Sequence, residues 1–291
     1  TKLKVGYSRF SDKQDETEFE VDFDRSTPRF TGDLTDVDIV DKELSLGLEH
    51  VFKLGENLEL AIGGFAQNKD RDTSILSIRD RFNLTAAARN YDQFSRNPEE
   101  FARPFGAPTF TPGSRNTIEE DRRDLFAEIE GKSGSLSFVA GVRYESTDFS
   151  VNDLTVAPAL AEQGNDYSFL LPSASVKIEV GSGGRITASA ARTNRRPRLD
   201  FLSPALLEAE FGDNDLLGNP ALRPETAWGG DLGYEQRLGR TGVIGVNLFY
   251  RKVKDLIELA NTGVEGSEGP GTFVLQPQNT GDGEVYGIEF D

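Results

Sequence analysis

The amino-acid sequence predicts an all-β protein with an antiparallel up-and-down sheet of the kind that forms a transmembrane β-barrel. Three observations support this: apolar and polar residues alternate, glycine-rich turns separate the alternating segments, and short and long connections take turns along the chain. Alternation with a period of two is typical of half-buried strands. No apolar run of about 18 residues occurs, which excludes a transmembrane helix but not barrel strands, because their average hydropathy is unremarkable.

The alternation defines the strands in order. "TKLKVGYSRF" at the start of the chain reads as a strand, and "ELSLGLEHVFKL" (43–54) has an apolar residue or His50 at every second position. "LSFVAGVRYES" (136–146) and "VIGVNLFYRK" (243–252) follow the same pattern, with Leu, Ile, Val and Tyr on one face. We therefore expect about ten strands, each long enough to cross a hydrocarbon layer at a tilt.

The connections fall into two sizes that alternate strictly. The short ones are "GEN", "GKSGS", "GSGG" and "GRTG". The long ones run through residues 24–37, 71–116, 149–165, 197–223 and 261–271. Because alternate connections of an up-and-down sheet lie at opposite ends, all short turns should share one rim and all long loops the other. Outer-membrane barrels have this asymmetry, with short periplasmic turns and long extracellular loops.

Two local features refine the prediction. Tyr144, Trp228 and Tyr250 are expected to face outward near the outer membrane interface, where aromatic rings form a girdle. The longest loop contains "NPEEFARPF" (97–105), in which Asn97 can cap a short helix that begins with a proline. The alternative for Tyr144, Trp228 and Tyr250 is that the three residues lie near the outer interface by chance.

Composition limits the function. The chain has 291 residues, a formal net charge of −17, no Cys and a single His. The acidic balance argues against a nucleic-acid partner. Disulfides and thiolate sites are excluded, and a lone His gives no support for a catalytic triad or a metal site, so we expect no enzyme activity, cofactor or metal. The chain also has no Met, and we interpret it as an internal piece of a longer precursor, with a trimmed mature domain as the alternative.

Five motifs in order resemble one known family. "GNPALRPETAWGGDLGYE" (218–235) resembles the G-N-P-x-L-x-P-E stretch of TonB-dependent outer-membrane receptors, where it closes an extracellular loop and opens a downward strand. The detailed match covers residues 122–291, whereas the first 120 residues fit the architecture without a nameable motif. The other four similar stretches are "LPSASVKIEV" (171–180), "RITASAARTNRRPRLDFLSP" (185–204), "VNLFYRKVKDLIE" (246–258) and "NTGDGEVYGIEFD" (279–291).

The resemblance implies a specific organisation. Residues 1–291 would form one partial domain of a 22-stranded barrel, without the plug domain and the TonB box that family members carry. It implies a Gram-negative outer-membrane location and active uptake of a scarce ligand, such as a ferric siderophore, haem, cobalamin or an oligosaccharide. The implied partners are membrane lipid, lipopolysaccharide, the plug, and the TonB complex of the inner membrane.

Two groups of residues are candidate site residues. Arg195, Arg196 and Arg198 are candidate ligand contacts, since guanidinium groups suit carboxylate, phosphate or catecholate oxygens. The alternative is that they pair with nearby acidic residues or with lipopolysaccharide phosphates. Strand alternation would put Arg195 on the face opposite Arg196 and Arg198. The residues of the family motif are expected to have structural roles: Gly218, Asn219, Pro220, Leu222, Pro224 and Glu225.

Other functions remain open at this point. A passive porin or a structural outer-membrane barrel would share the alternation and the loop asymmetry, but not the ordered motifs. A soluble all-β binding domain would bury its apolar faces against a second layer of protein. A barrel-embedded hydrolase is disfavoured, because His50 lies on the apolar face near a short turn.

Overall fold

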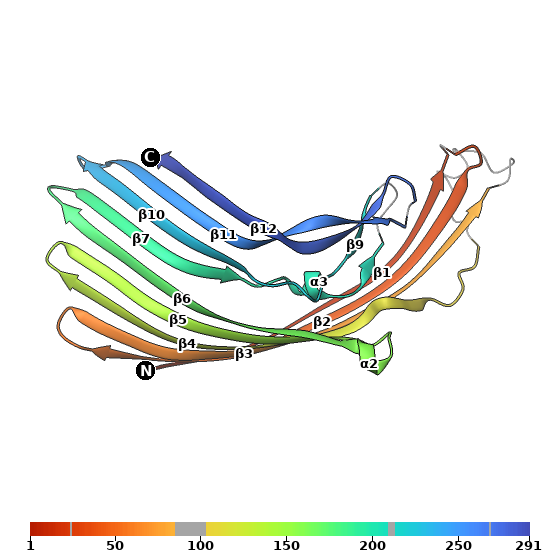
Figure 1. The fold of residues 1–291 in the computed structure, drawn as a ribbon, viewed down its shortest axis with the longest axis horizontal. Helices are drawn as coiled ribbons and strands as arrows, with labels where there is room; N and C mark the ends of the chain where they lie inside the picture. The colour runs from red at the N-terminus through yellow and green to blue at the C-terminus, as the bar shows by residue number, and fades with distance from the viewer. Residues whose placement is uncertain (24, 85–102, 209–212, 268) are drawn as a thin grey trace.

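The computed structural model describes residues 1–23, 25–84, 103–208, 213–267 and 269–291, and these form a single twelve-stranded sheet. Figure 1 shows one curved sheet whose strands follow one another across it, with both chain ends at the same side. The spatial order is β1-β2-β3-β4-β5-β6-β7-β10-β11-β12-β9-β8. The predicted all-β, up-and-down architecture is confirmed.

Ten strands are long and two are very short. The first long strands are β1 (Lys2–Asp22), β2 (Arg29–Lys53), β3 (Leu58–Asn83), β4 (Thr109–Ser133) and β5 (Leu136–Asp153). The others are β6 (Glu162–Val180), β7 (Gly184–Arg195), β10 (Glu225–Leu238), β11 (Gly242–Glu265) and β12 (Phe273–Phe290). The short elements are α2 (Pro158–Ala161), α3 (Leu199–Leu202), β8 (Leu206–Leu207) and β9 (Asp215–Leu217). Neither helix in the described part of the chain has the length and apolar character needed to cross a membrane.

The long strands pair antiparallel with their neighbours. The β1–β2 ladder runs without a shift from Lys2, opposite Glu49, to Asp22, opposite Arg29. β9 pairs in parallel with Val274 and Leu275 at the beginning of β12. The chain segment that precedes β10 therefore lies beside this end of β12. β1 and β8 are the two edges of the described sheet, so the sheet is not closed.

The connections are sorted by length as predicted. The short turns at 54–57, 134–135, 181–183 and 239–241 lie together at the left of Figure 1, and the long connections lie at the right. Glycine is needed in three of these turns, because Gly134, Gly181 and Gly239 have φ values of 59°, 57° and 64°. We call the part of each strand next to the short turns the lower half, and the part next to the long connections the upper half.

The predicted bounds of four long loops were wrong. The connections observed are 23–28, 84–108, 154–161 and 266–272, because strands continue well into the ranges 24–37, 71–116, 149–165 and 261–271. Apolar alternation fades in these upper segments, but the backbone ladder continues, and hydrogen bonds rather than hydropathy set where a strand ends. The helix expected at 97–105 falls largely outside the described residues.

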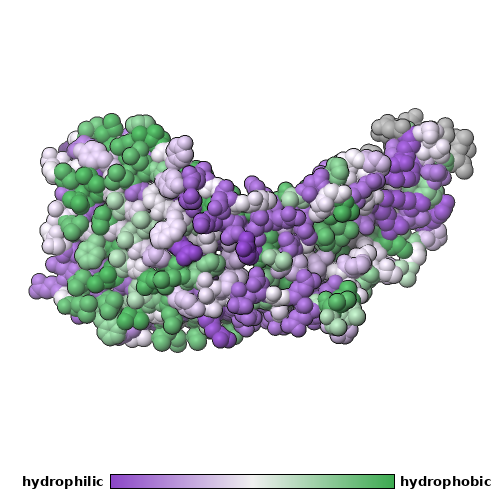
Figure 2. Space-filling view, in the orientation of Figure 1, coloured by the Kyte–Doolittle hydropathy of each residue, from purple (hydrophilic) through white to green (hydrophobic). Residues whose placement is uncertain are grey.

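The apolar residues of a strand lie on one face near the short turns and on the opposite face near the long connections. On β5, Val142 and Tyr144 are exposed on one face, whereas Phe149 and Val151 further up are buried on the opposite face. We call the face of Tyr144 the outer face and that of Phe149 the inner face. Figure 2 shows apolar residues gathered towards the short-turn end and polar residues towards the other end. Tyr144, Trp228 and Tyr250 are exposed on the outer face, as predicted.

The buried apolar cluster lies on the inner face of the upper half. Ile118 on β4 and Phe149 and Val151 on β5 pack with Leu202, Leu222 and Ile257, and Tyr167, Leu199 and Phe201 border them. The leucines at 44, 46 and 48 on the outer face of the lower half stay exposed. Within the described residues, therefore, no second protein layer covers the outer apolar face.

Candidate functional site at the upper rim

The segment between β7 and β10, residues 196–224, is the candidate site, and we call it the rim segment. β7 pairs with β6 only as far as Ala191, but with β10 as far as Arg195, so the upper end of β7 departs from β6. The rim segment begins there, includes α3, β8 and β9, and ends at β10. In Figure 1 the described parts of the rim segment, residues 196–208 and 213–224, lie within the curve of the sheet.

Two leucines fix the rim segment to the barrel wall. Leu202 on α3 is 1% exposed and Leu222 is 0% exposed, and both belong to the cluster formed with Ile118, Phe149 and Val151. Burying a leucine side chain stabilises a fold by roughly 1.5–3 kcal/mol. The apolar side chains on the inner face of the upper wall thus pack against this segment.

Hydrogen bonds from the motif residues complete the attachment. Asn219 donates its backbone N–H to the Phe201 carbonyl at 2.7 Å and its side-chain amide to the Pro277 carbonyl at 2.9 Å. Its side-chain oxygen accepts the N–H of Ala221 at 3.0 Å, which closes a tight turn around Pro220. Gly218 is required because a Cβ there would lie 1.7 Å from the Ser203 carbonyl oxygen.

Glu225 and Pro224 complete the motif at the first residues of β10. Both are buried. The Glu225 carboxylate accepts the backbone N–H of Ile257 at 2.8 Å and forms an ion pair with Arg195 at 2.9 Å. Pro224 has no N–H to leave unsatisfied in this enclosed position. This carboxylate ties β7, β10 and β11 together where the rim segment rejoins the sheet.

The three candidate arginines have different surroundings. Arg195 pairs with Glu225, and Arg198 pairs with Asp200 at 3.0 Å, yet both arginine side chains stay more than 70% exposed. Arg196 is largely enclosed and pairs with Glu120 at 2.6 Å. The predicted alternation of faces does not extend over them, because β7 ends at Arg195 and Pro197 cannot continue the ladder. Each of the three contacts a local carboxylate, and their role in ligand binding stays a prediction.

Arg196 belongs to a charged cluster on the inner wall. Asp124 accepts hydrogen bonds from Arg122 at 2.6 Å and from Arg143 at 2.7 Å. Glu145 contacts Arg122 at 2.7 Å and accepts an amide N–H from Asn194 at 2.8 Å. Three carboxylates, Glu120, Asp124 and Glu145, thus meet three guanidinium groups, Arg122, Arg143 and Arg196.

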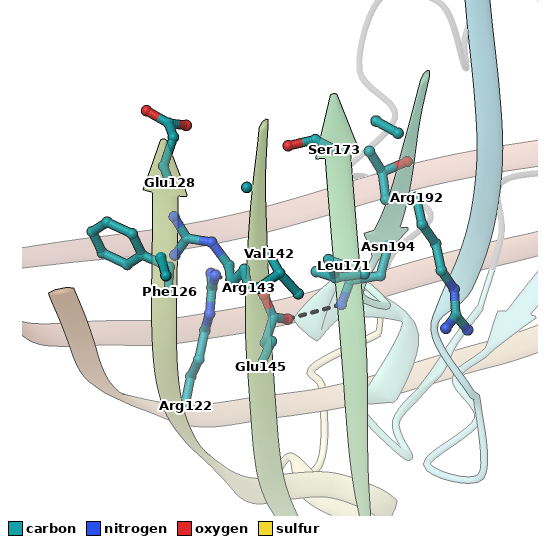
Figure 3. A pocket seen from close by; sticks show the side chains of 14 residues that line it. Arg122, Phe126, Glu128, Val142, Arg143, Glu145, Leu171, Ser173, Arg192 and Asn194 are labelled. Carbon is teal, nitrogen blue, oxygen red and sulfur yellow. Dashed lines mark hydrogen bonds and ion pairs between the residues drawn. The ribbon is translucent and has the colours of Figure 1, made fainter. Parts of the chain in front are cut away.

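This cluster borders a pocket of about 380 Å³ on the inner wall (Figure 3). In Figure 3, Arg122 and Arg143 extend between Phe126 and Glu145, and Asn194 reaches Glu145 from β7. The Glu145 side chain lies on this inner wall and is only 4% exposed. Sequence reasoning did not single out Glu120 and Asp124. The available signal was their spacing with Arg122, since residues two apart on a strand share a face.

An ion pair also connects the rim segment to β3. Arg71 on β3 donates hydrogen bonds to both carboxylate oxygens of Asp41 and also to Asp200 on α3. Partial burial alone would raise the pKa of Asp200, but the guanidinium groups of Arg71 and Arg198 outweigh it and hold that pKa below its usual value. Asp200 is therefore ionised at neutral pH and bridges two arginines.

No catalytic or metal-binding arrangement stands out in the described residues. No group of three or more His, Asp or Glu side chains there is placed to hold a metal ion. His50 contacts the Thr1 hydroxyl at 2.6 Å and the edge of Phe52, at the short-turn rim. This position is far along the sheet from the rim segment.

The family of the chain follows from comparison with known proteins. Residues 2–291 match the model of the TonB dependent receptor-like β-barrel. The chain therefore belongs to the TonB-dependent receptor β-barrel family, as the five motifs indicated. The match also includes the first 120 residues, in which we found no motif.

Solved structures share the fold. The ferric citrate transporter FecA is 12% identical with a TM-score of 0.52, the hemophore receptor HasR of Serratia marcescens 13% with 0.55, and the copper transporter OprC 13% with 0.58. Each comparison covers 99% of this chain but 36%, 45% and 42% of the respective structures. The chain thus spans less than half the length of these proteins, and at this identity the likeness concerns the fold.

Proposed function

We propose that residues 1–291 form part of the barrel domain of a receptor that imports a scarce ligand across the Gram-negative outer membrane. Ligand capture takes place at the upper rim, and an inner-membrane TonB complex supplies the energy. The observation that carries this proposal is the rim segment, whose family motif folds onto the inner wall and leaves Arg195 and Arg198 exposed beside the passage.

The outer face of the lower half supports the membrane location. The exposed apolar positions of β2 and of the turn residue after it run from Leu44 to Leu54, roughly the ten residues that a tilted strand needs to cross the hydrocarbon layer. Tyr144, Trp228 and Tyr250 lie at the upper ends of such apolar stretches, where an aromatic girdle belongs. Lipid and lipopolysaccharide are thus the proposed contacts of this face, with the long connections outside the cell.

The inner wall supports a role for a plug domain. The large barrels of outer-membrane transporters have a plugged lumen, whereas the smaller barrels of porins leave an aqueous channel. The exposed charges of the lower inner face, among them Glu128 and Glu130, would contact water and that plug. TonB would act through the plug and through regions of the receptor outside this chain.

The proposed ligand carries anionic oxygens. Arg195 and Arg198 each have one carboxylate partner and stay exposed, so donor N–H groups remain available to a second anion. Carboxylate or catecholate oxygens of a ferric siderophore would suit these groups best. Cobalamin and oligosaccharides offer fewer such contacts and rank behind it.

Energised uptake by the complete receptor tests the proposal. Cells that depend on the receptor are given a ⁵⁵Fe-labelled citrate complex, a ⁵⁵Fe-labelled catecholate siderophore or labelled cobalamin, with and without an uncoupler of the proton gradient. We expect the uncoupler to abolish accumulation of one ferric complex. The double variant R195Q/R198Q should weaken its uptake about tenfold at low concentration, because it removes two charge-assisted contacts.

Arg240 provides the matched control, because it is an exposed arginine in a short turn at the opposite rim. R240Q should leave uptake unchanged. Accumulation that resists the uncoupler would indicate a passive barrel instead. Equal uptake by R195Q/R198Q and R240Q would mean that Arg195 and Arg198 do not bind the ligand.

A further inference from the structure

An apolar groove crosses the outer face of the lower half, which is the face proposed above to contact lipid. The groove has a volume of about 670 Å³. Its floor is formed by Gly64 and Ala66 on β3, which lack the bulk of their neighbours. Its walls and ends are Leu46, Leu48, Leu125, Tyr144 and Ser146. Phe65 and Asp124 also border it, but their register places their side chains on the inner face.

The groove follows from residue size along one strand. Leu46 and Leu48 on β2 and Leu125 on β4 are at least 50% exposed, so they stand as ridges on either side of β3. Ala66 lies in register between Leu46 and Arg123, and Gly64 between Leu48 and Leu125. A narrow furrow between leucine ridges matches the shape of an extended hydrocarbon chain.

An unpaired cation closes the upper end of the groove. Arg123 lines it, is exposed, and lies in register with Ala66 on one side and Ser146 on the other. The inner-wall arginines Arg122, Arg143 and Arg196 all contact carboxylates. By contrast, Arg123 forms no ion pair with any residue in the described part of the chain. Tyr144 marks the level at which a lipid headgroup would lie.

We propose that this groove binds one phosphate-bearing lipid of the outer leaflet, with an acyl chain over Gly64 and Ala66 and the phosphate at Arg123. The proposal rests on the membrane location proposed above. Both parts of such a lipid find a partner, because the apolar furrow takes the chain and the guanidinium takes the anion. An apolar protein segment would leave Arg123 without a counter-charge.

Two matched lipids separate the contributions. The complete receptor, stripped of lipid in detergent, is titrated with phosphatidic acid and with the diacylglycerol that has the same two chains, and bound lipid is counted by native mass spectrometry. Inorganic phosphate is added alone as a third probe. We expect phosphatidic acid to bind about tenfold more tightly than diacylglycerol, since one charge-assisted contact distinguishes them, and phosphate alone not to bind.

Two variants and two controls locate the site. R123Q should reduce phosphatidic acid to the affinity of diacylglycerol, and A66L should weaken both lipids by filling the floor. R9Q removes an exposed arginine from β1, and A190L adds the same bulk to an exposed outer-face alanine on β7. Both controls should bind like the unaltered receptor.

The result that would overturn the site is equal loss of phosphatidic acid in R123Q and R9Q, or equal binding by A66L and A190L. Binding of inorganic phosphate at Arg123 without a lipid preference would do the same. Ligand uptake should stay normal in R123Q and A66L. If the unaltered receptor takes up no ligand but binds the lipids as expected, the proposed transport is wrong and the proposed lipid site is still supported.

Discussion

The lower and upper halves of this sheet use the same strands in opposite ways. In the lower half the outer face is apolar and exposed, as with Leu48 and Leu248, and the inner face carries exposed charges such as Glu128. In the upper half the inner face holds Ile118 and Phe149, and the outer face carries polar residues such as Asp148. The exchange occurs on β5 just after Tyr144.

The difference shows that the surroundings of a strand, rather than its pairing, decide which side chains it needs. The ladder between β4 and β5 runs unbroken through the exchange, from Leu136 to Asp153. On β5 the outer side chains up to Tyr144 are apolar or aromatic and fit a lipid environment, and those above it are polar and fit water. The apolar side chains of the upper half instead serve to hold the rim segment.

The largest expected effect comes from the same substitution made in both halves. Leu222→Ala removes a fully buried side chain, and a cavity of this kind costs about 2–5 kcal/mol. Leu248→Ala on the outer face should cost less than about 1 kcal/mol, because lipid tails are as apolar as leucine and can fill the space.

Hydrogen exchange in the lipid-embedded receptor measures this contrast. The N–H of Asn219, which bonds to Phe201, reports local opening of the rim segment. We expect it to exchange roughly thirtyfold faster or more in L222A, in line with the cavity cost, and to be unchanged in L248A. Similar rates in the two variants would mean that the leucine cluster does not hold the segment.

A smaller effect concerns the charge on Asp200. Its pKa is held below the usual value in the folded protein, so its contribution is present above the usual carboxyl pKa and is lost as pH falls through the lowered one. D200N should therefore speed exchange of the Asn219 N–H at pH 7, by less than about fivefold, because the pair with Arg71 is half exposed.

The difference between D200N and the unaltered receptor should disappear as the pH falls through the lowered pKa of Asp200, where the carboxyl group becomes protonated. Salt should reduce it as well, since partly exposed ion pairs are screened. A difference that persisted unchanged at low pH would assign the effect to packing rather than to charge. The comparison is made between variants at equal pH, so that the intrinsic exchange rate cancels.

Much of the lower half could be predicted from the sequence. Alternation such as that of Leu44, Leu46 and Leu48 reports the face directly, because one side of each strand is apolar over its whole membrane length. Glycines at 134, 181 and 239 marked turns whose positive φ only glycine adopts easily. Strand identity and the sorting of connections by rim followed from these two signals.

The upper half was predicted less well, for physical reasons. Strand segments such as Asn68–Thr73 have polar residues on both faces, so no hydropathy pattern reveals them. The burial of Glu145 depends on partners from other strands, Arg122 and Asn194. The packing of Leu202 and Leu222 against β4 and β5 joins residues that are far apart in the sequence, which no local pattern reports.

Spin labels along the outer face of β6 test the central claim most directly. Because the chain has no native Cys, single cysteines can be placed at Asp166, Ser168, Ala174 and Val176. In the complete receptor in lipid vesicles, labels at 174 and 176 should collide mainly with dissolved oxygen, which concentrates in lipid. Labels at 166 and 168 should collide mainly with a water-soluble nickel chelate. Equal accessibility to the chelate at all four positions would contradict the claim that the lower half of the outer face contacts lipid and the upper half contacts water.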